Sequence, residues 1–143
     1  MTDLNKAPYA ALVLRVTLGV LALAHGLLKI VVFTPAGTAC FFESLGLPGA
    51  LAYVVIAVEL AAGLALITGI FTRYAAIAII PILLGAIAFA HGHNGWLFTN
   101  QGGGWEYPAF WTVALAVQAM LGDGAFVWKP RAARQRVAVT MSS

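Results

Sequence analysis

The chain has 143 residues, of which 62% are hydrophobic and only 9% are charged, and its mean hydropathy is +0.92. Water-soluble domains carry about 25% charged residues, so this composition excludes an ordinary soluble domain and predicts an all-α integral membrane protein. The net charge of +3 does not predict a nucleic-acid partner, because most of the basic residues flank apolar runs, as Lys6 and Arg73 do, or follow the last run.

Four apolar runs cover about residues 9–33, 48–70, 74–92 and 105–122. The first three approach the roughly 20 residues that cross a hydrocarbon core, and the shorter fourth is expected to continue through residues 126–128. We therefore predict one transmembrane four-helix bundle within residues 1–128, followed by a basic cytoplasmic tail over residues 129–143. The tail is expected to contact anionic lipids.

The distribution of Lys and Arg predicts the orientation of this bundle. Lys6 precedes the first run, Arg73 separates the second run from the third, and the basic tail follows the fourth. The connections 34–47 and 93–104 contain neither Lys nor Arg. The positive-inside rule then places both termini in the cytoplasm and these two connections outside, as expected for a multi-pass protein of the inner (cytoplasmic) membrane.

The first run carries three basic side chains on one helical face. At about 100° per residue, Lys29 lies about 40° and His25 about 80° from Arg15 around the helix. Lipid does not accept such a face cheaply, so the interior of the protein is expected to receive it, although Arg15 lies deep enough to snorkel to the inner interface. Gly19 and Gly26 favour close helix contact. A cleaved signal peptide is not expected, because the run exceeds a signal h-region in length.

The second run contains one buried acid. Glu59 lies about 16 Å and His25 about 12 Å from the outer ends of their helices by helix rise. A carboxylate at this depth costs about 2.5–3.5 kcal/mol, so Glu59 should face the interior. We predict His25 as its first partner, with Lys29 in reach from one turn above. The preceding connection 34–47 is apolar enough to form an interfacial piece, and its Cys40 has no second cysteine for a disulfide.

The third and fourth runs place polar and aromatic residues near the outer surface. Pro81 is expected to kink the third helix, which ends near His91 and His93, and Glu106 stands at the start of the fourth helix. An outer aromatic belt is predicted from Trp96, Trp105, Tyr107 and Trp111. The histidines and Glu106 form only a weak metal pattern and no C-x-x-C-H is present, so we predict no metal or haem site.

These polar residues are expected to form a column through the bundle. Ionisable groups inside a membrane usually serve function, so Glu59, His25 and Lys29 are the candidate catalytic residues, suited to a proton path or a ligand with a polar head. The alternative interpretation is that Glu59 pairs with one of them only to fix the helix register.

The motifs identify a family. The chain resembles the DoxX family of small four-helix bacterial membrane proteins in Arg15, Gly19 and the H-G-x-x-K of residues 25–29. The F-F-E-x-L-G-L-P connection, Glu59, the G-I-F-T-R turn at residues 69–73 and the late G-G-G-W-E-Y complete the resemblance. It extends from about Leu14 to Asp123.

The resemblance implies redox work at the membrane, in quinone-linked oxidation or in oxidative-stress complexes. It implies a quinone-type head group at Glu59, His25 and Lys29, and electrons from a partner protein or soluble donor. The additional residues expected to bind such a group are Arg15, His91, Glu106 and Trp105. Two alternatives stay open: an oligomeric small-molecule or proton-coupled permease, and a non-catalytic scaffold that recruits a stress-response enzyme through its tail.

Overall fold

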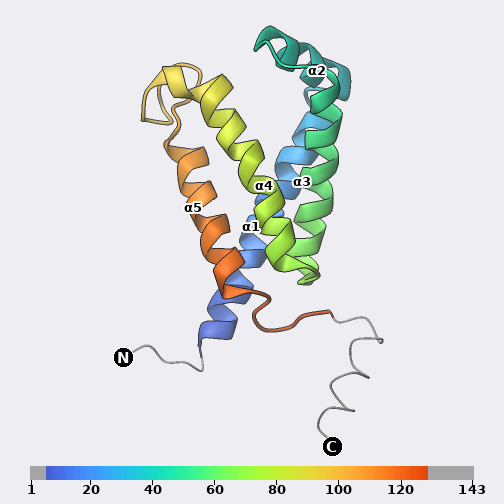
Figure 1. Ribbon diagram of the computed structural model, residues 1–143, viewed down its shortest axis with the longest axis vertical. Coiled ribbons are helices and arrows are strands. Elements are labelled where there is room, and N and C mark those ends of the chain that lie inside the picture. The colour runs from blue at the N-terminus through green and yellow to red at the C-terminus, as the bar shows by residue number, and fades with distance from the viewer. Residues whose placement is uncertain (1–5, 129–143) are drawn as a thin grey trace, which may run out of the picture.

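The computed structural model describes residues 6–128, which are all-helical and contain no strand. Five α-helices follow one another in the chain: α1 (Ala7–Val31), α2 (Pro35–Ser44), α3 (Ala50–Thr68), α4 (Thr72–Gly85) and α5 (Glu106–Leu121). Helix α4 continues through a π-helical turn, η1 (Ala86–His91), into a short 3₁₀ turn, η2 (Gly92–Asn94) (Figure 1). The basic tail predicted for residues 129–143 lies outside the described residues.

Three of these helices are long and apolar enough to cross a membrane: α1, α3 and the continuous helix Thr72–Asn94. Helix α5 has 16 residues, about 24 Å by helix rise, which is shorter than a hydrocarbon core of about 30 Å. The predicted continuation of α5 through residues 126–128 is wrong. Gly122 has a φ of 76°, which turns the chain away from the helix axis, and the Trp128 N–H donates to the Thr68 carbonyl at the end of α3.

Helices α1 and α3 pack closely because glycines face each other across their contact. A Cβ atom on Gly19 would lie 2.8 Å from the Gly63 carbonyl oxygen, and one on Gly63 would lie 2.9 Å from the Leu23 nitrogen. Gly26 likewise leaves room for the Leu60 side chain, 2.9 Å from the position of a Cβ atom. The prediction that Gly19 and Gly26 permit close contact is therefore confirmed, as in other small-residue helix interfaces.

The helices converge at one end and diverge at the other. Figure 1 shows α4 and α5 leaning away from α1 and α3 toward the end that carries α2. At the opposite end, which we name the closed end, α3 turns into α4, and a cluster of buried side chains fills the bundle from there to mid-height. Its members include Leu18, Ala22, Leu66, Ile79, Leu83, Trp111 and Leu115. Pro81 lies within α4.

Arg15 ties the closed end together. Its guanidinium is fully buried and donates to the carbonyls of Leu66 and Ile67 at the end of α3, both at 3.1 Å. It also donates to the carbonyls of Ala125 and Phe126, at 2.9 and 2.8 Å. A cation here meets the negative end of the α3 dipole and the carbonyls that the helix leaves unpaired. Arg15 therefore does not snorkel to the interface.

The glycine that ends α3 makes room for this arginine. Gly69 is left-handed, with a φ of 76°, and a Cβ atom at this position would collide with the Arg15 guanidinium. Glycine adopts this conformation without the strain that other residues incur. The glycine of the G-I-F-T-R turn therefore leaves space for the side chain of Arg15, which lies more than fifty residues earlier in the chain.

We expect Arg15→Met to destabilise the bundle, because the buried carbonyls at the ends of α3 and of the segment after α5 would lose their donor. The free energy of unfolding should fall by on the order of 3 kcal/mol. Unfolding in mixed micelles, followed by circular dichroism, measures this change. Arg73→Met is the matched control, since exposed Arg73 makes one hydrogen bond, to the Ala119 carbonyl, and should cost about 1 kcal/mol or less. Equal losses for the two variants would contradict the assigned role.

Candidate functional site

A cavity of about 920 Å³ occupies the space between the diverging helices. It is bounded by α1 and α3 on one side, by α4, η1 and the start of α5 on the other, and by α2 and the segment after it. This volume falls within the range of small-molecule sites, which are mostly apolar with a few polar groups. The apolar walls include Phe41, Phe42, Leu45, Leu47, Ile82 and Phe89.

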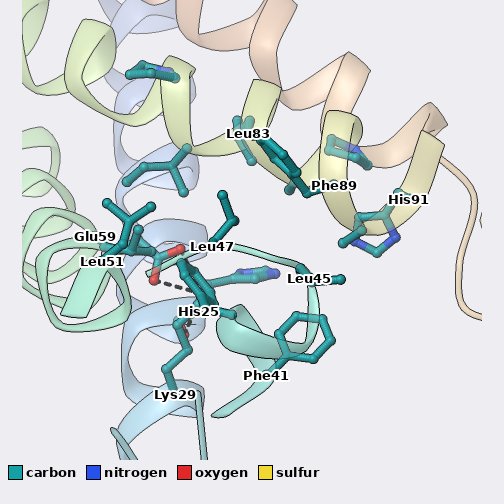
Figure 2. Close-up of a pocket in the computed structure, with 18 of the residues that line it drawn as sticks. His25, Lys29, Phe41, Leu45, Leu47, Leu51, Glu59, Leu83, Phe89 and His91 are labelled. Carbon is teal, nitrogen blue, oxygen red and sulfur yellow. Dashed lines mark hydrogen bonds and ion pairs between the residues drawn. The ribbon is translucent and has the colours of Figure 1, made fainter. Parts of the chain in front are cut away.

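An ion pair stands in the wall of this cavity. The Lys29 ammonium lies 2.8 and 2.9 Å from the two carboxylate oxygens of Glu59 (Figure 2). The Glu59 side chain is 5% exposed and the Lys29 side chain 19%, so the pair is largely removed from solvent. A pair of this kind keeps both charges inside the protein at tolerable cost and leaves them in contact with whatever enters the cavity.

The predicted choice of His25 as first partner of Glu59 is wrong, since Lys29 takes that position. The depth estimate treated α1 and α3 as parallel rods with level ends. The long Lys29 side chain instead folds back one turn along α1, where its ammonium also lies 3.5 Å from the His25 carbonyl. Four methylene groups give lysine a reach that the short imidazole side chain lacks.

His25 connects α1 to α5. Its Nδ1 donates to the Leu21 carbonyl at 2.9 Å, which is one turn earlier in the helix. Its ring centre lies 4.9 Å from that of Trp111 and 6.3 Å from that of Tyr107. Trp111 is 3% exposed and therefore belongs to the core and the cavity wall, not to the predicted outer belt. Its indole nitrogen is buried and has no partner among the described residues.

The histidines near the outer end also reach the cavity. His91 lies at the end of the π-helical turn, on the far side of the cavity from Glu59 (Figure 2), and His93 also lines the cavity. A π-helical turn carries extra chain per turn and so rotates the residues after it out of the α-helical register. The His91 Nδ1 donates to the Gly103 carbonyl at 3.0 Å. Asn94 donates to the carbonyls of Gly102 and Gly103, so the loop is held against the helix.

Three of the predicted site residues lie elsewhere. Arg15 belongs to the closed end and does not line the cavity. Glu106 accepts a hydrogen bond from the Phe98 N–H at 2.8 Å. Trp105 packs edge-on against Trp96, with ring centres 4.4 Å apart. Glu106 and Trp105 therefore shape the loop over residues 95–105. Within residues 6–128, no group of three or more His, Cys, Asp or Glu side chains gathers to hold a metal ion.

Several cavity residues were not predicted. Trp111 and Tyr107 are four residues apart, one turn on α5, and this spacing was the available signal that they share a face toward His25. Phe41 and Phe42 were assigned only to an interfacial piece, and their place over the cavity depends on how α2 packs against α3. Asn94 carried no sequence signal of a structural role.

We expect Lys29→Met to lower the free energy of unfolding by about 3–5 kcal/mol, because it leaves the Glu59 carboxylate buried without its cation. The double variant Lys29→Met with Glu59→Gln removes both charges and should recover most of that loss. Glu59→Gln alone should cost less than Lys29→Met, since the Lys29 side chain is more exposed than that of Glu59, 19% against 5%, and its ammonium can turn toward water. Unfolding of the three variants in one micelle system measures these differences. A double variant as unstable as Lys29→Met would contradict the pairing.

Comparison with known proteins identifies the family of this chain. The family model of DoxX matches residues 10–92. The protein named "Putative oxidoreductase CatD" from Bacillus subtilis (strain 168) is 41% identical over 85 residues, which are 59% of this chain and 62% of that relative's length. No solved structure matches the chain. Because the family match covers more than half of the sequence, the chain is a membrane protein that belongs to the DoxX family.

Proposed function

We propose that this protein is the membrane subunit, or a small enzyme, of a quinone-linked redox system. The observation that carries the proposal is an apolar cavity of about 920 Å³ with the Lys29–Glu59 ion pair and His25 in its wall. A quinone head group needs hydrogen-bond partners at membrane depth and an apolar space for its tail, and the polar and apolar side chains of the cavity wall support both. The name of the Bacillus subtilis relative, "Putative oxidoreductase CatD", supports a redox function.

The residues of the cavity fit a flat aromatic head group. Trp111 and Tyr107 offer ring faces beside His25, and the unpartnered indole N–H of Trp111 is a donor that a ligand can satisfy. When bound, a quinone supplies two-electron chemistry, with two protons taken up for every two electrons that a partner protein or soluble reductant delivers. The role proposed for Glu59, Lys29 and His25 is to orient the head group and to hold or pass those protons.

We further propose that the chain crosses a bacterial inner membrane four times, with both termini in the cytoplasm. Lys6 and Arg73 stand at the closed end, and the connections 32–49 and 95–105 at the cavity end contain no Lys or Arg. This asymmetry supports an orientation with the closed end inside and the cavity in the outer half of the membrane. In this arrangement α5 is the fourth, short span, and its length suits a locally thinned bilayer.

Two other functions lead to different expectations. A permease needs a path through the bundle, but the buried cluster of Leu18, Leu66, Ile79 and Leu115 fills the closed end of a single chain. A path between copies of a homo-oligomer would avoid this cluster, and proton flux into proteoliposomes would support it. A scaffold that recruits an enzyme through residues 129–143 would bind its partner without any need for the cavity, and deletion of those residues would then abolish the partnership.

We expect purified protein in lipid nanodiscs to bind short-tailed benzoquinone and naphthoquinone analogues saturably, with quenching of tryptophan fluorescence. Trp111→Phe should remove most of the quenching, because Trp111 is the tryptophan in the cavity wall. Glu59→Gln should weaken binding and slow quinone reduction by membranes supplied with a donor by about 100-fold, the range for losing a positioned acid–base group.

The matched control for these variants is Phe110→Leu on the outward face of α5, where Phe110 is 73% exposed. This variant should bind and react like the unmodified chain. Absence of saturable binding by either quinone class, with the protein folded, would remove the proposal. Quenching that Trp111→Phe leaves intact would place the quinone outside this cavity.

A further inference from the structure

The polar atoms of the cavity wall differ in hydrogen-bonding capacity, because two of its three histidines, both partly buried, donate to the backbone through Nδ1. The His25 Nδ1 lies 2.9 Å from the Leu21 carbonyl, and the His91 Nδ1 lies 3.0 Å from the Gly103 carbonyl. A carbonyl only accepts, so each Nδ1 must carry the proton. In a neutral ring the remaining nitrogen, Nε2, is then a hydrogen-bond acceptor, and neither Nε2 has a partner within residues 6–128.

The charged donor of the cavity is also occupied. The Lys29 ammonium has three hydrogens and three contacts: the two oxygens of Glu59 and, at 3.5 Å, the His25 carbonyl. The Glu59 carboxylate, by contrast, retains lone pairs that Lys29 does not use. Asn94 directs its amide nitrogen to the carbonyls of Ala90, Gly102 and Gly103, which leaves its side-chain oxygen as a further acceptor.

The remaining donors are few. The Trp111 indole N–H is one, exposed His93 offers one ring donor and one ring acceptor when neutral, and the Tyr107 hydroxyl can donate or accept. The acceptors are more numerous and include the Nε2 atoms of His25 and His91 and the side-chain oxygens of Glu59 and Asn94. A ligand that presented only acceptors would leave most of these groups unpaired in an apolar cavity, where an unpaired polar atom is costly.

We propose that this cavity selects the reduced, dihydroxy form of its aromatic ligand over the oxidised diketone form. The inference rests on the proposed function and specifies it: a quinol ring donates two O–H groups, which the histidine Nε2 atoms and the wall oxygens accept, whereas a quinone ring has only carbonyls to offer. A site that holds the reduced form about tenfold more tightly raises the two-electron potential of the bound pair by about 30 mV, which favours electron transfer from a donor.

The test compares three probes that share one ring and one short alkyl tail: a 1,4-benzoquinone, its hydroquinone and the dimethyl ether of that hydroquinone. Binding to the full chain in nanodiscs is measured without oxygen at about pH 8, where free imidazole is neutral. We expect the hydroquinone to bind about tenfold more tightly than the quinone, as one or two added hydrogen bonds allow. The ether, which has the same shape without donors, should bind no better than the quinone.

The variants His25→Phe and His91→Phe assign the preference to its source. Phenylalanine keeps a ring at each position, against Trp111 in the case of His25, and removes the acceptor, so the hydroquinone should lose affinity while the quinone keeps it. Phe110→Leu is the control, as above. A quinone or ether that binds as tightly as the hydroquinone overturns this inference and leaves the quinone site standing. A preference that both histidine variants retain overturns the assignment to histidine, and failure of all three probes to bind overturns the proposed function itself.

Discussion

The bundle depends on giving every buried charge a partner in a protein that lipid surrounds. Arg15 and the Lys29–Glu59 pair lie at different heights of the same helix pair and solve this problem in different ways. Arg15 donates to backbone carbonyls at the end of α3, so its guanidinium is paired within the protein and does not line the cavity. Lys29 and Glu59 neutralise each other at the cavity, where the pair stays in contact with an incoming molecule.

The contrast between the two ends of the bundle follows from packing. Glycines at positions 19 and 63 bring α1 and α3 close together, and Arg15 connects both to the segment after α5. At the other end, α4 and α5 diverge from α1 and α3 (Figure 1), and the loop between α4 and α5 is held to η1 by the hydrogen bond from His91 to the Gly103 carbonyl. The cavity is the space that this divergence leaves, and His25 with Trp111 and Tyr107 forms the contact that spans it at its inner limit.

The difference between the closed end and the cavity end suits the proposed function. One end of the molecule is closed by a buried apolar cluster, so the proposed head group would lie against the polar atoms at the inner limit of the cavity. The other end is walled by exposed and half-buried apolar side chains from α2 and the segment after it, such as Phe41 and Leu45, which suit a hydrocarbon tail. Electrons are expected to come from outside the chain, which makes the partner or soluble donor the component that sets the direction of the reaction.

Composition and apolar run lengths were sufficient to predict an all-helical membrane protein, and the helix boundaries lie within a few residues of the expected ones, because hydrophobic length follows directly from bilayer thickness. The continuation of α5 was mistaken, since a single left-handed glycine, Gly122, ends the helix despite the apolar residues that follow. That Glu59 needed a cation was also predictable, because a lone carboxylate at that depth is too costly.

Which cation it meets was decided by tertiary structure, since helix rise measures depth along an axis and says nothing of crossing angle or side-chain reach. For the same reason Arg15, which shares a helical face with Lys29, serves the closed end and not the cavity. Trp111 could be read as an interfacial aromatic until its packing against His25 was known. Helical periodicity places a side chain on a face; only the packing of the neighbouring helices determines what that face meets.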